Sequence, residues 1–293
     1  MLTTLHEYPS GLACWRLLRE PRNVTMTQIE LPFPAENKEG IVDAFARAIT
    51  PRTRVMSFCH INFTTGLRMP VKELCRLARD NGIISVVDGA HAIGMLDLNL
   101  HDLGCDFYAA SPHKWLNAPP GTGVLYIRDG MLENFWPTIT ETSPPFAPDI
   151  NVLQGRGQQF TPAFACLNDL IDFQQNTIGK ERVESRILAL SSYVKDKIRE
   201  TWGEESLFSP VDEALSSGLT SFNPFADHSD FTKIKVYTRL REKYNIIVRS
   251  VCFKNRLSDP KSTAAMRVST HIFNNYREID KLIDSLQALI AEM

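Results

Sequence analysis

The chain has 293 residues, 43% of them hydrophobic, which is enough for a sizeable core and for two domains. Its formal net charge of −2 gives no reason to expect a nucleic-acid footprint or a strong attraction to membrane surfaces. No apolar run is long enough to span a bilayer, and the first residues lack the pattern of a signal peptide. The six cysteines show no CxxC spacing, so we expect a reduced, cytoplasmic setting.

The first half of the chain alternates strand-like and helix-like segments. A helical pattern opens at Pro70 and closes at Asn81-Gly82, and residues 98–103 form a turn or a short helix. Strand-like runs lie at residues 54–59, 83–87, 107–110 and 123–127. Strands that alternate with helices in this way predict a mostly parallel sheet with helices on both faces.

The second half predicts a smaller α/β domain. Residues 136–150 form a proline-rich break. Helical patterns follow at residues 162–175, 181–201 and 277–293, with a strand-like run at 246–249. We therefore expect a large domain over residues 1–170 and a small C-terminal domain over residues 171–293.

Polar side chains follow three of the predicted strands directly. His60 follows the first of these strands, Asp88 and His91 follow the second, and Ser111 and Lys114 follow the third. Ligands of an open parallel sheet gather at the carboxyl ends of its strands. If the sheet is parallel, the three groups should meet in one crevice.

Two of these residues suit a pyridoxal 5′-phosphate (PLP) site. Such a site needs a lysine amine for a Schiff base and a carboxylate that keeps the pyridine nitrogen protonated. It also needs donors for the phosphate and a cation for the substrate carboxylate. Lys114 and Asp88 can supply the amine and the carboxylate. An opposite charge at contact range moves a pKa by roughly 1–3 units, so Asp88 could hold the pyridinium charged.

Each residue also has an ordinary structural interpretation. Asp88 could cap a helix or form a turn, Lys114 could lie at the surface, and Arg267 could form a surface ion pair. His91 and Asp88 have a spacing that permits a shared metal ion, but no further clustered Cys or His supports one, so we expect no metal. The joint arrangement of strand-Asp-x-x-His and strand-Ser-x-His-Lys, with a glycine-rich turn at 120–123, favours the PLP site.

Seven stretches carry a resemblance to a known family. They are HEYPSG (6–11), ITPRTRV (49–55), HINFTTG (60–66), VVDGAHAIGMLDL (86–98), LGCDFYAASPHKW (103–115), PPGTGVLYIR (119–128) and MRVSTHIFNN (266–275). With these motifs in this order, the chain resembles the class V aminotransferase family of fold-type I PLP enzymes. It is most similar to the isopenicillin N epimerase-like branch. The resemblance implies the PLP-transferase fold type I and a homodimer.

The resemblance also assigns the catalytic residues. Lys114 would carry the Schiff base, and Asp88 would pair with the pyridine nitrogen. His91 would lie near the phenolic oxygen of the cofactor, where related enzymes often carry Gln.

Further binding residues follow from the same resemblance. Ser111 and His113 would help to hold the phosphate. Arg267 would bind the substrate α-carboxylate, which suits a bidentate guanidinium. His6 or Tyr8 would stack on the cofactor ring.

The chain departs from the family pattern at two places. It begins at the strand before HEYPSG, whereas family members carry a preceding segment that includes a phosphate-binding loop. We therefore expect a large domain without its N-terminal part, and weak PLP binding. Residues 154–159 read QGRGQQ, where the family often has a Gly-Thr-Arg stretch that reaches the phosphate of the neighbouring subunit.

The expected function is that of a PLP-dependent enzyme acting on an α-amino acid, with transferase, isomerase or lyase chemistry left open. The family includes transaminases, epimerases, cysteine desulfurases and C–S lyases. A desulfurase needs a mobile cysteine upstream of the carboxylate-binding arginine; Cys252 lies in that region, outside the usual His-Cys setting. An inactive remnant of such an enzyme, or an interaction subunit, is a further alternative.

Overall fold

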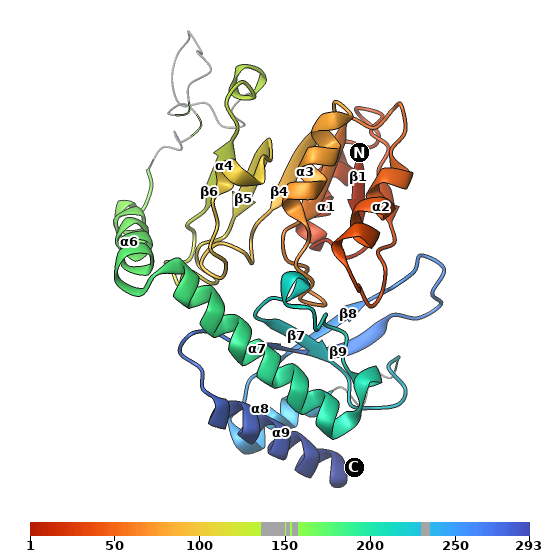
Figure 1. The fold of residues 1–293 in the computed structure, drawn as a ribbon, viewed down its shortest axis with the longest axis vertical. Coiled ribbons are helices and arrows are strands. Elements are labelled where there is room, and N and C mark those ends of the chain that lie inside the picture. Colours follow the sequence, from red (N-terminus) through yellow and green to blue (C-terminus); the bar gives the residue numbers. More distant parts are fainter. Residues whose placement is uncertain (136–149, 151–152, 154–157, 230–234) are drawn as a thin grey trace.

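A computed structural model describes the chain except for residues 136–149, 151–152, 154–157 and 230–234 (Figure 1). Most of the predicted proline-rich break and most of the QGRGQQ stretch lie outside the described residues. Among the described residues, no helix combines the length and the hydropathy that a membrane span requires.

The first half of the chain forms a six-stranded sheet in the order β2-β1-β3-β4-β5-β6. All neighbouring pairs are parallel except β5 and β6, which are antiparallel. The strands are β1 (Leu2–Thr4), β2 (Thr27–Ile29), β3 (Val55–Cys59), β4 (Ile84–Asp88), β5 (Phe107–Ala110) and β6 (Val124–Ile127). The predicted fold class, a mostly parallel sheet flanked by helices, is confirmed.

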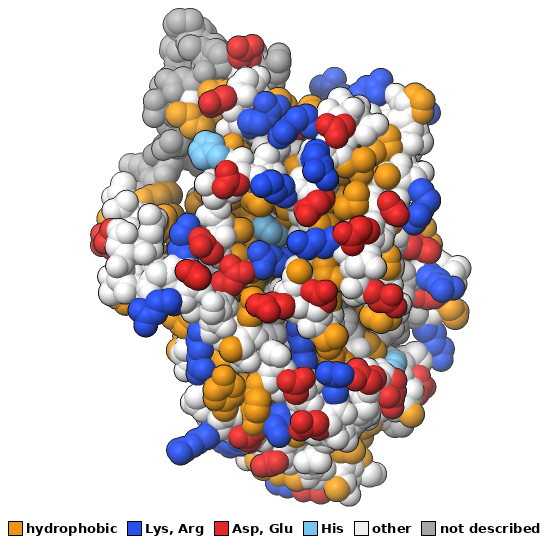
Figure 2. Space-filling view, viewed as in Figure 1, with side chains coloured by type: hydrophobic (Ala, Val, Ile, Leu, Met, Phe, Trp, Pro, Cys, Tyr) orange, Lys and Arg blue, Asp and Glu red, His pale blue; other side chains and the backbone are white. Residues whose placement is uncertain are grey.

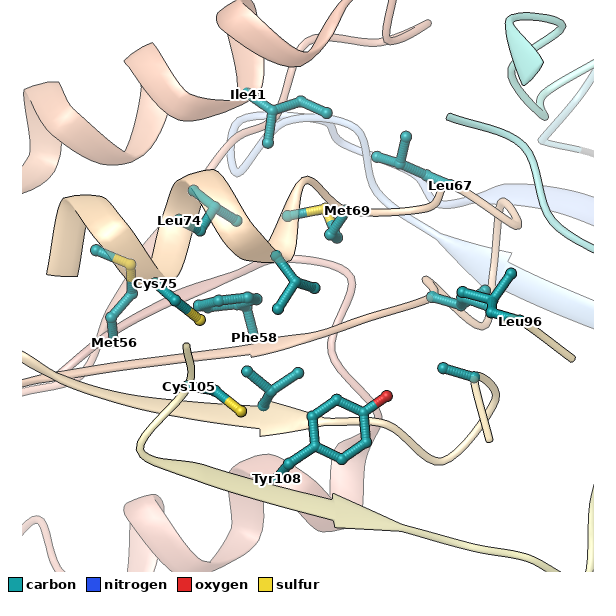
Figure 3. Close-up of a cluster of buried hydrophobic side chains, with 14 of the residues drawn as sticks. Ile41, Met56, Phe58, Leu67, Met69, Leu74, Cys75, Leu96, Cys105 and Tyr108 are labelled. Carbon is teal, nitrogen blue, oxygen red and sulfur yellow. The ribbon is translucent and has the colours of Figure 1, made fainter. Parts of the chain in front are cut away.

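Helices flank this sheet, and the second and third of them bury apolar side chains in its core. The helices are α1 (Pro9–Leu17), α2 (Lys38–Ala48), α3 (Val71–Asp80) and the short α4 (Leu100–Leu103), followed by a 3-10 turn at Leu132–Asn134. Figure 3 shows Leu74 and Cys75 of α3 pointing towards Met56 and Phe58 of β3. All four of these side chains are buried. The helical spacing of α3 places its apolar residues on one face, which is the face that meets β3.

The second half forms a three-stranded antiparallel sheet in the order β7-β9-β8. Its strands are β7 (Leu219–Phe222), β8 (Arg249–Phe253) and β9 (Thr263–Ser269). The helices of this half are α6 (Thr161–Asp172), a π-helical turn (Phe173–Ile178), α7 (Lys180–Trp202), α8 (Val236–Tyr244) and α9 (Tyr276–Ala291), with 3-10 turns at Glu204–Ser206 and Glu213–Leu215.

Helix α7 connects the two halves (Figure 1). Val183 and Ile187 near its start belong to the core of the first sheet. Leu190, Val194 and Ile198 further along belong to the core of the second sheet. The predicted domain division at residues 170/171 falls inside α6, and it stays a prediction.

The loop that follows β3 anchors the second sheet to the first. Gly66 adopts φ 73°, and a Cβ at this position would lie 2.0 Å from the carbonyl oxygen of Leu219. The hydroxyl of Ser217 donates to the Gly66 carbonyl at 2.6 Å, and the hydroxyl of Ser209 donates to the Thr65 carbonyl at 2.5 Å. The second sheet is therefore held at the carboxyl end of β3, where the sequence predicts the site.

The strand predicted at 246–249 is shifted in the structure, since β8 begins at Arg249. Asn245 ends α8 in the left-handed conformation at φ 53°, and the Ile246 amide donates to the Leu240 carbonyl. Ile246 therefore completes the end of α8, although the β-branched side chains of residues 246–248 favour a strand.

Acidic and basic side chains alternate over the face drawn in Figure 2, without a large area of one sign. This distribution agrees with the near-neutral balance of the sequence.

Candidate active site

Two adjacent parallel strands bring Asp88, His91 and Lys114 together. Asp88 is the last residue of β4 and pairs in register with Cys59 of β3 and Ala109 of β5. The Ala90 amide donates to Asp88 Oδ1 at 2.9 Å, which fixes the carboxylate at the strand end. Lys114, in the turn after β5, places its Nζ 3.3 Å from Nε2 of His91. The second and third of the predicted polar groups therefore meet at this edge of the sheet.

The first predicted group has a structural role instead. His60 is buried, and its Nδ1 lies 2.9 Å from the Tyr108 hydroxyl. Asn62 Oδ1 accepts hydrogen bonds from the amides of Thr64 and Thr65, so it shapes the loop.

Gly89 allows Tyr108 to approach the strand end closely. A Cβ at Gly89 would lie 1.9 Å from Cε1 of Tyr108. A glycine directly after Asp88 therefore lets the buried Tyr108 ring pack against the backbone at the end of β4.

Lys114 is half-buried, and its Nζ lies 5.9 Å from the centroid of the Tyr8 ring. Burial lowers the pKa of Lys114; the Asp88 carboxylate raises it, and the charge of Arg267 lowers it again. A lysine with a lowered pKa has a larger fraction of free amine, which is the nucleophilic form.

His91 is held by the residue that follows Lys114. The indole Nε1 of Trp115 donates to Nδ1 of His91 at 3.1 Å. Burial, with the positive charges of Lys114 and Arg267, lowers the pKa of His91 to about 3. His91 is therefore a neutral imidazole at physiological pH.

Arg267 lies inside β9. Its Nη1 donates to the Phe63 carbonyl at 2.5 Å, whereas its buried Nε has no hydrogen-bond partner among the described residues. Burial and the neighbouring Arg249 lower its pKa to about 10. The guanidinium stays charged at neutral pH, and it lies close enough to Lys114 and His91 to affect their titration.

The two candidates for ring stacking lie in different places. His6 is buried, with Nδ1 3.1 Å from the Thr64 hydroxyl, and burial lowers its pKa to about 4. Tyr8 is 52% exposed and packs edge-on against Phe63, with ring centroids 5.2 Å apart. The structure therefore brings Tyr8 close to Lys114, while His6 lies in the core.

Ser111 and His113 share the turn that carries Lys114. The Lys114 amide donates to the Ser111 carbonyl at 3.1 Å, and the side chain of His113 is exposed. Their predicted contact with a phosphate stays a prediction.

Sequence reasoning missed Glu7, which lies buried near Asp88. The Thr4 hydroxyl donates to Glu7 Oε1 at 2.6 Å. Burial raises the pKa of Glu7 to about 7; the Thr4 hydrogen bond lowers it and the Asp88 charge raises it. An acidic residue inside the HEYPSG motif was the available signal, but a pattern does not separate a buried carboxyl from an exposed one.

A match to a family model identifies the family of the chain. The model of the family described as "Aminotransferase class-V" matches residues 1–282. The chain belongs to the aminotransferase class-V family.

Among class-V relatives, an isopenicillin N epimerase of Streptomyces clavuligerus is 31% identical, over 98% of this chain and 73% of the relative. A probable cysteine desulfurase of Halalkalibacterium halodurans is 27% identical, over 98% of this chain and 70% of the relative. The resemblance predicted from the motifs is confirmed, as is the prediction of a class-V-aminotransferase-like enzyme.

Solved structures of the same fold include a cysteine desulfurase from Thermococcus onnurineus NA1. It superposes with a TM-score of 0.80 at 22% identity, covering 100% of this chain and 72% of that one. A cystine C-S lyase in complex with its product cysteine persulfide superposes with a TM-score of 0.82 at 22% identity, covering 97% and 74%. At this identity the likeness establishes the fold of the class-V chain.

Proposed function

We propose that this protein is a PLP-dependent enzyme that acts on an α-amino acid, with Lys114 as the residue that binds the cofactor covalently. The observation that carries the proposal is the position of Lys114. Its amine lies at the carboxyl edge of a parallel sheet, 3.3 Å from a neutral His91, with a pKa lowered by burial. Membership of the class-V family supports the choice of cofactor.

The side chains at this edge of the sheet fit PLP chemically. Lys114 offers an amine, Asp88 a carboxylate, and Tyr8 an aromatic ring beside the amine. The buried Nε of Arg267 has no hydrogen-bond partner in the described part of the chain, so it offers a donor for an anionic group.

Bound PLP would supply an electron sink that weakens the bonds to the Cα of an amino acid. Asp88 would hold a proton on the pyridine nitrogen, because a carboxylate favours a neighbouring positive charge. Lys114 would bind the cofactor and carry a proton to and from Cα. Ser111 and His113 would donate to the phosphate, and Arg267 would bind the substrate carboxylate.

The alternative functions differ in the groups that their reactions require. An outcome within the aminotransferase and epimerase group needs no cysteine nucleophile, whereas a desulfurase does. In the β8–β9 ladder Arg249 pairs with Arg267, and Cys252 pairs with Ala264. Side chains alternate between the faces of a strand, so Cys252 points to the face opposite Arg267. This parity disfavours Cys252 as a nucleophile, and with it the desulfurase alternative; the C–S lyase alternative needs no such cysteine.

A homodimer in a reducing, cytoplasmic setting completes the proposal. The six cysteines are all unpaired, which supports the setting. Membership of the class-V family supports the homodimer. A monomeric mass at micromolar concentration with full cofactor occupancy would contradict the dimer.

Absorbance spectroscopy tests the covalent attachment. Titration of purified protein with PLP should produce a visible band that differs from the spectrum of free PLP. Lys114→Ala should lose the band, and Lys72→Ala, which changes an exposed lysine of α3, should keep it. An unchanged band in folded Lys114→Ala protein would refute the proposal.

A further inference from the structure

We propose that Trp115 is a positioning residue that fixes the tautomer of His91, so that Nε2 carries the proton and points it towards Lys114. The proposal concerns His91 in the protein alone. Its functional meaning rests on the proposed PLP chemistry.

The chemistry of the two partners determines the tautomer. The indole N–H of Trp115 can only donate a hydrogen bond, and it lies 3.1 Å from Nδ1 of His91. Nδ1 must therefore accept. A neutral imidazole with an accepting Nδ1 carries its single proton on Nε2. That nitrogen is the one that lies 3.3 Å from Lys114 Nζ.

The tautomer has a consequence for Lys114. An Nε2–H group forms a direct hydrogen bond with a lysine only if the amine is neutral and accepts. Burial and the charge of Arg267 shift the pKa of Lys114 down, towards the neutral amine that this hydrogen bond requires, while the Asp88 carboxylate shifts it up. Trp115 would thus act through His91 to keep the reactive amine next to a donor. Once PLP is bound, the same donor would be available to its phenolic oxygen.

The second half of the chain holds Trp115 in place. The imidazole of His271 stacks on the Trp115 ring, with centroids 5.4 Å apart and planes 13° apart. The Ile272 amide donates to Nδ1 of His271 at 2.8 Å, so Nε2 of His271 carries a proton and donates to the Trp115 carbonyl at 2.9 Å. His271 follows β9, the strand that carries Arg267. The segment that carries Arg267 therefore also orients Trp115, and Trp115 in turn determines the tautomer of His91.

Nitrogen NMR of ring-labelled histidine reads the tautomer directly. In protein without PLP, long-range proton–nitrogen spectra should show His91 as the neutral Nε2–H form between pH 5 and 8. The signals of His91 are identified by their loss in His91→Gln. Wild-type protein with the proton on Nδ1, or with a charged His91 in this range, would overturn the proposal without any variant.

Trp115→Phe removes the N–H group and keeps an aromatic ring against His271. The ratio of the two His91 tautomers should shift towards Nδ1–H by roughly three- to tenfold, the effect expected for the loss of one hydrogen bond. Trp202→Phe, whose ring stacks on Phe222 in the second core, should leave the ratio unchanged. An unchanged ratio in folded Trp115→Phe also overturns the proposal. The readout is independent of PLP, so a failure of the proposed function would appear in the absorbance titration and not here.

Discussion

At the residue scale, the site combines a half-buried amine, a carboxylate fixed at a strand end and a neutral histidine. Asp88, His91 and Lys114 could be predicted from sequence, because each follows a recognisable strand and neighbouring parallel strands end together. Trp115, Phe63 and Glu7 could not be predicted, because their roles depend on contacts between segments far apart in the chain.

Asp88→Asn tests the role of the carboxylate. The variant should still bind PLP to Lys114, but exchange of the substrate Cα proton should slow by roughly 10- to 1000-fold, the equivalent of 1–3 pKa units at the pyridine nitrogen. Deuterium exchange at Cα, followed by proton NMR, measures the rate. Asp102→Asn on α4 is the control, since this carboxylate is exposed. Equal exchange rates in wild type and Asp88→Asn would refute the role.

Arg267→Met tests the carboxylate site. Loss of a buried charged partner costs roughly 2–5 kcal/mol, so the affinity for an amino-acid substrate should fall tens- to thousands-fold. The affinity for PLP should stay within about twofold, because Arg267 would contact the substrate. Titrations of both ligands, with the exposed Arg241→Met of α8 as control, measure the two affinities. A loss of PLP affinity with unchanged substrate affinity would contradict the assignment.

At the element scale, the strands of four or five residues in the first sheet were easier to predict than those of three. The predicted strand at 107–110 matches β5, and the helix predicted from Pro70 matches α3. β1 and β2 have three residues each, too few for a periodic pattern, and they form through pairing with neighbouring strands. β7 and β9 likewise depend on long-range pairing.

Two glycines with similar backbone angles provide a matched test of the loop after β3. Gly66 and Gly82 have φ values of 73° and 65°, but only Gly66 lacks space for a Cβ. Gly82→Ala should cost about 1–2 kcal/mol, the cost of a left-handed backbone. Gly66→Ala should cost about 1–3 kcal/mol more, because the Cβ collides with the Leu219 carbonyl. Urea denaturation of both variants measures the difference; equal losses would show that the loop does not need this close contact.

At the scale of the whole molecule, stability depends on buried ionisable groups around the site. The pKa of Glu7 is raised from 4.5 to about 7, so the folded protein holds this proton more tightly than the unfolded chain. The stability from Glu7 is fully present below pH 4.5 and is lost as the pH rises to about 7. The pKa values of His6 and His60 are lowered to about 4 and 3, so their contribution is lost as the pH falls below 6.5.

The variant Glu7→Gln separates the contribution of Glu7 to stability from the contributions of the two histidines. The difference in unfolding free energy between Glu7→Gln and wild type should rise by on the order of 3 kcal/mol, in favour of the variant, from pH 4.5 to pH 7.5. The histidine contributions are common to both proteins and cancel. Urea titrations at several pH values give this difference. A difference that does not change with pH would show that Glu7 does not hold a proton in the folded protein.

The central claim is that Lys114 binds PLP covalently. Borohydride reduction of the PLP-loaded protein converts the attachment into a stable label, and peptide mapping by mass spectrometry locates it. We predict a single labelled peptide, with the label on Lys114. A label on any other lysine of folded protein would contradict the account.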